Sequence, residues 1–299
     1  MANNKRTQLL KQQQAAAKAA KRNRIIIAVS GVVVVALALV GIVVWQSNTP
    51  ATPEGSVQTT ASATASDTGT ATATSAAPTP PANVFIPPNG TAEMGYIEVK
   101  ADNVSPDALT VDEQLDYQCP YCHLADSVIG PSFRALAERG DIILRVHIRS
   151  FLDSGLKNDS STRAAMAATC ADTVGDFIAY HETVFANQPP EGVGYTDQQL
   201  RVDFAAQAGI TGADLTEFQA CYDSQKTLGY VQAMEQVNAT SRTINGADQD
   251  PAGGTPAFYV NGTPLLLNQM VGVNSDNSWY PKVDTSPEGF LAFLKTIPA

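Results

Sequence analysis

The sequence predicts a mixed α/β domain with an inserted all-helical block, preceded by a single transmembrane helix and a disordered linker. Three observations support this fold class. An uncharged apolar run lies near the N-terminus, a strand–helix–strand pattern occupies residues 96–149, and apolar side chains then recur at the three-to-four spacing of helices over residues 160–240. The expected segments are a basic cytoplasmic tail (1–24), a transmembrane helix (25–45), a linker (46–92) and a domain (93–299) with its helical insertion at about 157–245.

The apolar run from Ile25 to Trp45 contains 21 residues and no charge, and the tail before it holds seven basic residues and no acidic ones. At about 1.5 Å per residue, a helix of this length spans the roughly 30 Å core of a bilayer. The basic flank favours the cytoplasmic side, so the domain is expected outside the cytoplasm. A cleaved signal peptide is the alternative, but the run is longer than its usual apolar region and lacks a small-x-small cleavage pattern.

The linker is composed mostly of Thr, Ala, Ser and Pro, with too few large apolar groups to bury a core. The chain beyond the basic tail carries a formal charge of −17, because 12 Lys and Arg residues face 29 Asp and Glu residues. Such a charge argues against nucleic acid as a partner.

The first part of the domain is expected to be a βαβ unit with parallel strands. Strands are predicted at 96–101, 108–117 and 141–149, and a helix from Cys119 to about Arg139 that Gly140 ends separates the last two.

The last part of the domain, after the helical block, is expected to be a ββα unit. Residues 257–260 and 263–267 are predicted strands joined by an Asn261-Gly262 turn, and Ser286 is expected to cap a final helix. The two units together predict a mixed sheet with helices on both faces.

The segment Cys119-Pro120-Tyr121-Cys122 places two thiols at the expected start of a helix. Unpaired backbone N–H groups and the helix dipole favour a thiolate at Cys119, and Pro120 suits the first helical position. Cys122 is then close enough to attack a mixed disulfide on Cys119, so we predict a redox pair. A static disulfide and half of a metal site are the alternatives. The chain has four cysteines and three histidines but no second CxxC, and we expect neither a metal nor a cofactor.

The remaining cysteines, Cys170 and Cys221, fall in two helix-like segments and are predicted to form a structural disulfide. A bond between them closes a loop of about 50 residues, which contributes about 4 kcal/mol in the chain-entropy model. A second redox pair that passes electrons to the first is the alternative. Neither cysteine has a partner nearby in sequence, and this makes the alternative weaker.

Residues Leu115–Cys122 and Gly254–Gly262 together resemble the DsbA-like thioredoxin-fold proteins, most closely the membrane-tethered kind found in actinobacteria. Residues 161–165 and 185–189 are similar to the helical insertion of that family, and the resemblance covers about residues 93–299. It implies a thioredoxin fold and a thiol:disulfide oxidoreductase that introduces disulfide bonds into unfolded exported polypeptides. A VKOR-like or DsbB-like integral membrane protein would reoxidise it.

The resemblance also implies a cis bond between Thr255 and Pro256 that lies against the CxxC, where the Thr255 backbone pairs with an extended substrate. Glu113 stands six residues before Cys119, close to where thioredoxin-like folds carry a buried carboxylate. We predict that it accepts the proton of Cys122. A solvated acid is the alternative reading of Glu113, and Asp116 is the reserve candidate.

Tyr121 bears on the direction of the reaction. The strongest oxidants of the family have histidine just before the second cysteine, and tyrosine offers no positive charge to a thiolate. Potentials run from about −270 mV for thioredoxin to about −120 mV for DsbA, and we expect an oxidant weaker than the strongest. A reductase or isomerase of the same fold is the alternative, and a tethered binding or chaperone domain is a second one.

Four further residues receive no catalytic role from the sequence. His123 lies beside the CxxC and is expected to face solvent or pack on its helix. His147 and His181 are interpreted as packed or surface histidines, and Trp279 as a packing residue.

Overall fold

The computed structural model describes residues 84–298, apart from residues 92, 94, 241–242, 245–246 and 249–253. The predicted cytoplasmic tail, the predicted transmembrane helix and most of the predicted linker lie outside these residues. Within the described part of the chain, no helix is both long and apolar enough to cross a membrane.

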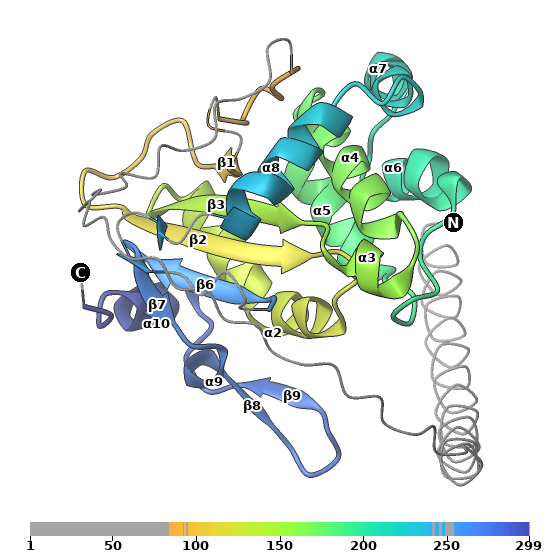
Figure 1. Ribbon diagram of the computed structural model, residues 1–299. Coiled ribbons are helices and arrows are strands. Elements are labelled where there is room, and N and C mark those ends of the chain that lie inside the picture. Colours follow the sequence, from red (N-terminus) through yellow and green to blue (C-terminus); the bar gives the residue numbers. More distant parts are fainter. Residues whose placement is uncertain are drawn as a thin grey trace, which may run out of the picture. The chain divides into compact units, whose positions relative to one another are not determined.

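A mixed sheet, five-stranded in the described residues, forms the centre of the domain (Figure 1). Its strands in spatial order are β1 (Ile97–Val99), β3 (Ile142–Arg149), β2 (Leu109–Asp116), β6 (Ala257–Val260) and β7 (Thr263–Leu265). β2 and β3 are parallel and are joined through α2 (Pro120–Glu138), and the other neighbours are antiparallel. The predicted mixed α/β fold with its βαβ unit is confirmed.

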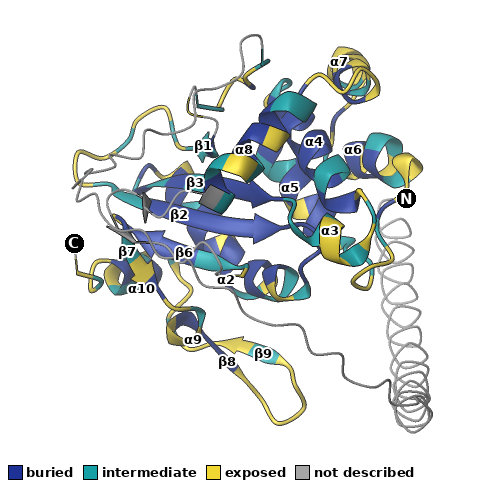
Figure 2. Cartoon of the chain, in the orientation of Figure 1, coloured by how far each residue is buried: buried dark blue, intermediate teal, exposed yellow. Residues whose placement is uncertain are grey.

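β2 is the central strand, and it is buried from Val111 to its end (Figure 2). Residues that lie opposite one another in an antiparallel pair point to the same face of the sheet, and Glu113 lies opposite Phe258 of β6. The Phe258 ring stacks on Phe133 of α2 at a centroid distance of 5.5 Å. Glu113 therefore points toward α2.

The other face of β2 is polar and packs against α8 (Leu228–Thr240). His147 of β3 contacts Asp112 through Nε2 at 2.9 Å and Asn238 of α8 through Nδ1 at 2.9 Å. Helices thus cover both faces of the sheet, because α2 and α10 (Pro287–Leu294) pack on the Glu113 face. Because successive side chains of β2 alternate between the two faces, Glu113 lies on the α2 face and Asp112 on the α8 face.

The helical insertion lies between β3 and β6. Its helices in the described residues are α3 (Leu152–Leu156), α4 (Ser160–Asp172), α5 (Phe177–Ala186), the π-helix η1 (Gln199–Asp203), α6 (Phe204–Gln207), α7 (Gly212–Asp223) and α8. A disulfide between Cys170 of α4 and Cys221 of α7 joins two of these helices, and both cysteines are buried.

The segment after β7 differs from the expectation. The predicted strand 263–267 ends at Leu265, because the Leu266 N–H donates to Gln269 Oε1 at 2.8 Å and begins α9 (Leu267–Met270). A hairpin of β8 (Val271–Val273) and β9 (Trp279–Pro281) follows, and two short strands, β4 (Thr243–Ile244) and β5 (Ala247–Asp248), pair farther upstream. Strands of two or three residues are too short to leave a period in the sequence.

Candidate active site

Cys119 and Cys122 occupy the first turn of α2. Cys119 is the N-cap residue, its N–H donates to Asp116 O at 3.0 Å, and Pro120 takes the first helical position. The Cys122 N–H donates to Cys119 O at 3.1 Å and closes the turn. Cys119 is 6% exposed and Cys122 is 2% exposed, so the first cysteine is the more accessible of two buried residues.

The two cysteines have opposite proton affinities. A hydrogen bond from the Cys122 thiol is the largest cause that lowers the pKa of Cys119 to about 6, and it outweighs burial. The Thr255 hydroxyl and the N–H groups of Tyr121 and Cys122 lower this pKa further. Burial and the adjacent Cys119 raise the pKa of Cys122 well above its ordinary value. At neutral pH the pair therefore consists of one thiolate, on Cys119, and one thiol.

The Thr255–Pro256 peptide bond is cis and lies against the first cysteine, with Cys119 Sγ 3.3 Å from Thr255 O. The Thr255 hydroxyl is buried and makes no hydrogen bond of ordinary geometry to the described residues. It nevertheless lowers the pKa of both cysteines. Pairing of this backbone with a substrate stays a prediction.

We expect Thr255→Val to raise the pKa of Cys119 by up to about one unit, because valine keeps the shape of threonine and removes the hydroxyl dipole. The ultraviolet absorbance of the thiolate, followed against pH in the reduced protein, measures this change. Thr263→Val, on β7, is the matched control and should titrate as the wild type does. Identical titrations of both variants would contradict a role for the Thr255 hydroxyl.

Glu113 is buried beneath α2 and is not a solvated acid. Burial and the negative charge of Asp126 raise the pKa of Glu113 to about 8, and Arg134 opposes them. The carboxyl group is therefore mostly protonated at neutral pH, which suits an acid that gives a proton to a departing thiolate. The predicted role of Glu113 as acceptor of the Cys122 proton is the reverse of this transfer, and both directions stay predictions.

Asp116, the reserve candidate, connects β2 to the helical insertion. It accepts hydrogen bonds from Gln118 N at 2.9 Å, Leu152 N at 3.2 Å and Ser161 Oγ at 2.6 Å. Burial raises the pKa of Asp116 to about 7 against these hydrogen bonds. With its oxygens engaged by three donors, Asp116 is better suited to hold the end of the strand than to exchange a proton with a cysteine.

The helical insertion also holds the CxxC turn through Gln188 and Tyr195, and we call these two residues the insertion clamp. Gln188 Nε2 donates to Tyr117 O at 2.8 Å and to Cys119 O at 3.0 Å, and Tyr195 OH donates to Tyr117 O at 2.7 Å. His123 binds the same insertion, with Nδ1 2.7 Å from Phe185 O. The sequence indicated this contact only through the family likeness of residues 185–189.

Trp279, predicted from the sequence to be a packing residue, lies beside the CxxC. Its ring contacts the Tyr121 ring at a centroid distance of 5.9 Å, and it lies opposite Val273 in the β8–β9 hairpin. Tyr121 is 59% exposed and Val273 is 54% exposed. Tyr121, Trp279 and Val273 therefore form a small apolar surface beside the redox pair, on a hairpin that is largely exposed in Figure 2.

The two other histidines are packed, as expected. His147 is buried between Asp112 and Asn238. His181 of α5 is buried with Nδ1 3.0 Å from Tyr117 OH.

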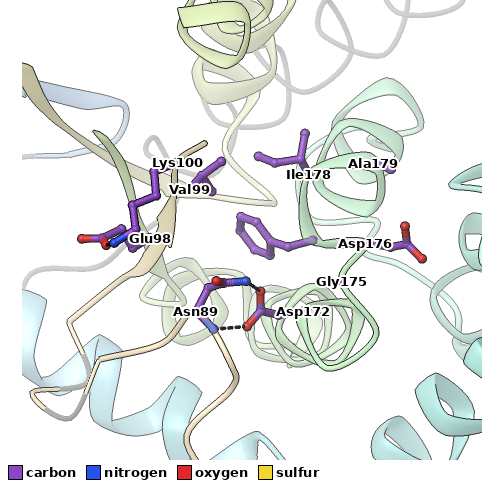
Figure 3. A pocket seen from close by; sticks show the side chains of 10 residues that line it. Asn89, Glu98, Val99, Lys100, Asp172, Gly175, Asp176, Ile178 and Ala179 are labelled. Carbon is purple, nitrogen blue, oxygen red and sulfur yellow. Dashed lines mark hydrogen bonds and ion pairs between the residues drawn. The ribbon is translucent and has the colours of Figure 1, made fainter. Parts of the chain in front are cut away.

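A cavity of about 320 Å³ lies apart from the CxxC, between β1, the end of α4 and the start of α5 (Figure 3). Asp172 lines it and accepts hydrogen bonds from Asn89 N and Asn89 Nδ2, both at 2.8 Å. None of the predicted site residues lines this cavity. Over the described part of the chain, no group of three His, Cys, Asp or Glu side chains is arranged to hold a metal ion.

Three solved structures illustrate what the fold is similar to. Reduced DsbA from Mycobacterium tuberculosis is 23% identical, over 57% of this chain and 84% of that one, with a TM-score of 0.46. The reduced disulfide bond oxidoreductase DsbG of the same organism is 22% identical, over 68% and 86%, with a TM-score of 0.49. The thiol-disulfide oxidoreductase MdbA from Corynebacterium diphtheriae is 20% identical, over 62% and 94%, with a TM-score of 0.48. No curated protein matches the sequence.

A protein-family model described as Thioredoxin matches residues 105–270. The matched segment is more than half of the 299 residues and contains both Cys119 and Cys122 and the cis Thr255–Pro256 bond. The chain therefore belongs to the thioredoxin family.

Proposed function

We propose that the protein is a thiol:disulfide oxidoreductase that donates the Cys119–Cys122 disulfide to exported polypeptides. The observation that carries this proposal is the opposite proton affinity of two cysteines in one helical turn, with a thiolate favoured at Cys119 and a thiol at Cys122. Membership of the thioredoxin family supports it.

The reaction runs in two exchanges. A substrate thiolate attacks Cys119 Sγ, the Cys119–Cys122 bond breaks, and Cys122 leaves with the electron pair and takes up a proton, for which Glu113 is the candidate donor. A second substrate thiolate then attacks the substrate sulfur of the mixed disulfide and releases Cys119 as a thiolate. The substrate loses two electrons to the cysteine pair, which ends as one thiolate and one thiol.

The direction of disulfide exchange depends on how strongly the reduced cysteine pair is stabilised. A more stabilised Cys119 thiolate makes the disulfide more oxidising. The pKa of Cys119, about 6, lies between the values of about 7 for thioredoxin and about 3.5 for DsbA. This intermediate pKa supports an oxidant of intermediate strength, in keeping with the tyrosine at residue 121.

The place of the reaction is part of the proposal. The apolar run 25–45 and the basic tail before it support a single-pass anchor that holds the domain outside the cytoplasm. A membrane oxidase of the VKOR-like or DsbB-like kind would then restore the disulfide by accepting its two electrons.

The test measures the reduction potential of the cysteine pair together with oxidative refolding of a reduced protein that needs several disulfides. We expect the wild type to accelerate refolding and Cys119→Ser to reduce the rate to that without enzyme. Cys122→Ser is the matched control. Its Cys119 thiolate should still attack substrate disulfides, and the mixed disulfides should accumulate because no second thiol resolves them. Full activity of Cys119→Ser would show a tethered binding domain instead, and a potential at or below about −270 mV, that of thioredoxin, would show a reductase.

A further inference from the structure

A buried ion pair lies directly below the redox cysteines on α2. Asp126 follows Cys122 by one helical turn, so the two side chains share one face of the helix. Asp126 Oδ1 is 2.5 Å from Arg134 Nη1, and both residues are 8% exposed. A full charge pair is thus buried where α2 packs against α5, and electrostatic effects are stronger there than at a surface.

Two residues of α5 complete the surroundings of this pair. His181 Nε2 lies 3.6 Å from Asp126 Oδ1, and Glu182 Oε1 lies 2.5 Å from Arg134 Nε. Burial acts to raise the pKa of Asp126, but His181 and Arg134 outweigh it and the pKa is lowered. Asp126 therefore carries a fixed negative charge across the neutral pH range.

Glu113 faces this pair from the sheet. Its neighbours across β2 are Val146 of β3 and Phe258 of β6, which carry no charge. The charged groups that act on it are Asp126, which disfavours the ionised carboxylate, and Arg134, which favours it. The titratable groups of α5 nearest to this pair, His181 and Glu182, contact Asp126 and Arg134 respectively.

We propose that Asp126 and Arg134 are positioning residues that set the proton occupancy of Glu113, and thereby the pH range in which Cys122 leaves as a thiol. The part that concerns Cys122 rests on the proposed function. The part that concerns Glu113 is measurable in the reduced protein without any reaction.

Asp126 and Arg134 carry opposite charges, so removing one or the other should shift the pKa of Glu113 in opposite directions. Asp126→Asn removes the negative charge and leaves that of Arg134, so the pKa of Glu113 should fall by about one unit or more. Arg134→Met removes the positive charge and leaves that of Asp126, so the same pKa should rise by a similar amount. A role in packing alone does not predict shifts of opposite sign.

The test is an isotope-edited infrared titration of the Glu113 carboxyl in the reduced full chain, with the pH profile of disulfide exchange as a second measurement. Asp112→Asn is the matched control, because Asp112 is also a buried acid paired with a neighbour, His147, but on the opposite face of the sheet. It should leave the titration unchanged. Arg134→Lys and Asp126→Glu keep the charges, and the Glu113 titration in each should be close to that of the wild type. These two variants also serve as the test if the neutral variants fail to fold.

The proposal would be overturned if the pKa of Glu113 shifted in the same direction in Asp126→Asn and Arg134→Met, or if it shifted in neither. In the Glu113→Gln background, Asp126→Asn should produce no further change in the pH profile. A wild type that transfers no disulfides while Glu113 shifts as expected would refute the proposed function alone. A wild type that transfers disulfides while Glu113 does not shift would refute the inference alone.

Discussion

Glu113→Gln is expected to stabilise the fold at neutral pH. The pKa of Glu113 is about 8 in the fold against an ordinary value of 4.5, so folding at pH 7 must protonate a carboxylate that the unfolded chain leaves ionised. This protonation costs on the order of 3 kcal/mol at pH 7. Because the folded pKa is raised, the stability of the wild type falls as the pH rises from about 4.5 to about 8.

Glutamine resembles the protonated acid and does not titrate, so the stability gain should grow across that pH window and vanish below it. Denaturant unfolding of both proteins at several pH values measures the gain. Glu138→Gln, an exposed position on α2, is the control and should leave the pH dependence unchanged. A Glu113→Gln protein with the stability of the wild type at every pH would mean that Glu113 ionises normally in the fold.

The same substitution is expected to slow disulfide transfer. Cys122, with a pKa raised well above its ordinary value, must take a proton as it leaves, and an acid with a pKa of about 8 gives one downhill. Removing such a positioned donor should reduce the rate about 100-fold. Stopped-flow measurement of mixed-disulfide formation with a peptide thiol, corrected for ionisation of that thiol, checks the value. An unchanged rate would leave Glu113 a buried acid without a part in the exchange.

Removing the second cysteine pair is expected to produce the other large effect, on stability. The Cys170–Cys221 bond joins residues 51 apart, and a loop of that length contributes about 4 kcal/mol in the chain-entropy model. The double variant Cys170→Ala/Cys221→Ala should lose about that free energy of unfolding, measured with denaturant. At a temperature where the variant stays folded, its disulfide transfer should equal that of the wild type. Loss of transfer in the folded variant would instead support the alternative in which this pair passes electrons to the CxxC.

Local pattern and motif chemistry anticipated the elements that position the cysteines. The run from Leu109 to Asp116 reads as a strand, Pro120 marks the first helical position, and Gly140 adopts the left-handed conformation that ends α2. The burial of Glu113 followed from its alternation with the apolar residues Val111 and Leu115. These features depend on residues close together in the chain.

Features that depend on distant residues were not visible in the sequence. Gln188 and Tyr195 are ordinary loop residues until the fold brings them to the CxxC turn. Asp126 and Arg134 appear as two charges of an amphipathic helix, and only the packing of α5 shows that both are buried. Trp279 lies in a strand too short to show a period, so its contact with Tyr121 had no local signal.

The insertion clamp has a consequence for how the protein is made. Gln188 is 69 residues after Cys119, and Cys221 is 51 residues after Cys170. Synthesis proceeds from the N-terminus. Cys119 and Cys122 are therefore made before Gln188, which holds their turn, and Cys170 is made before Cys221, to which it bonds. The nascent chain thus exposes three thiols before Cys221 is made, and its own maturation depends on Cys170 bonding to Cys221 and not to Cys119 or Cys122.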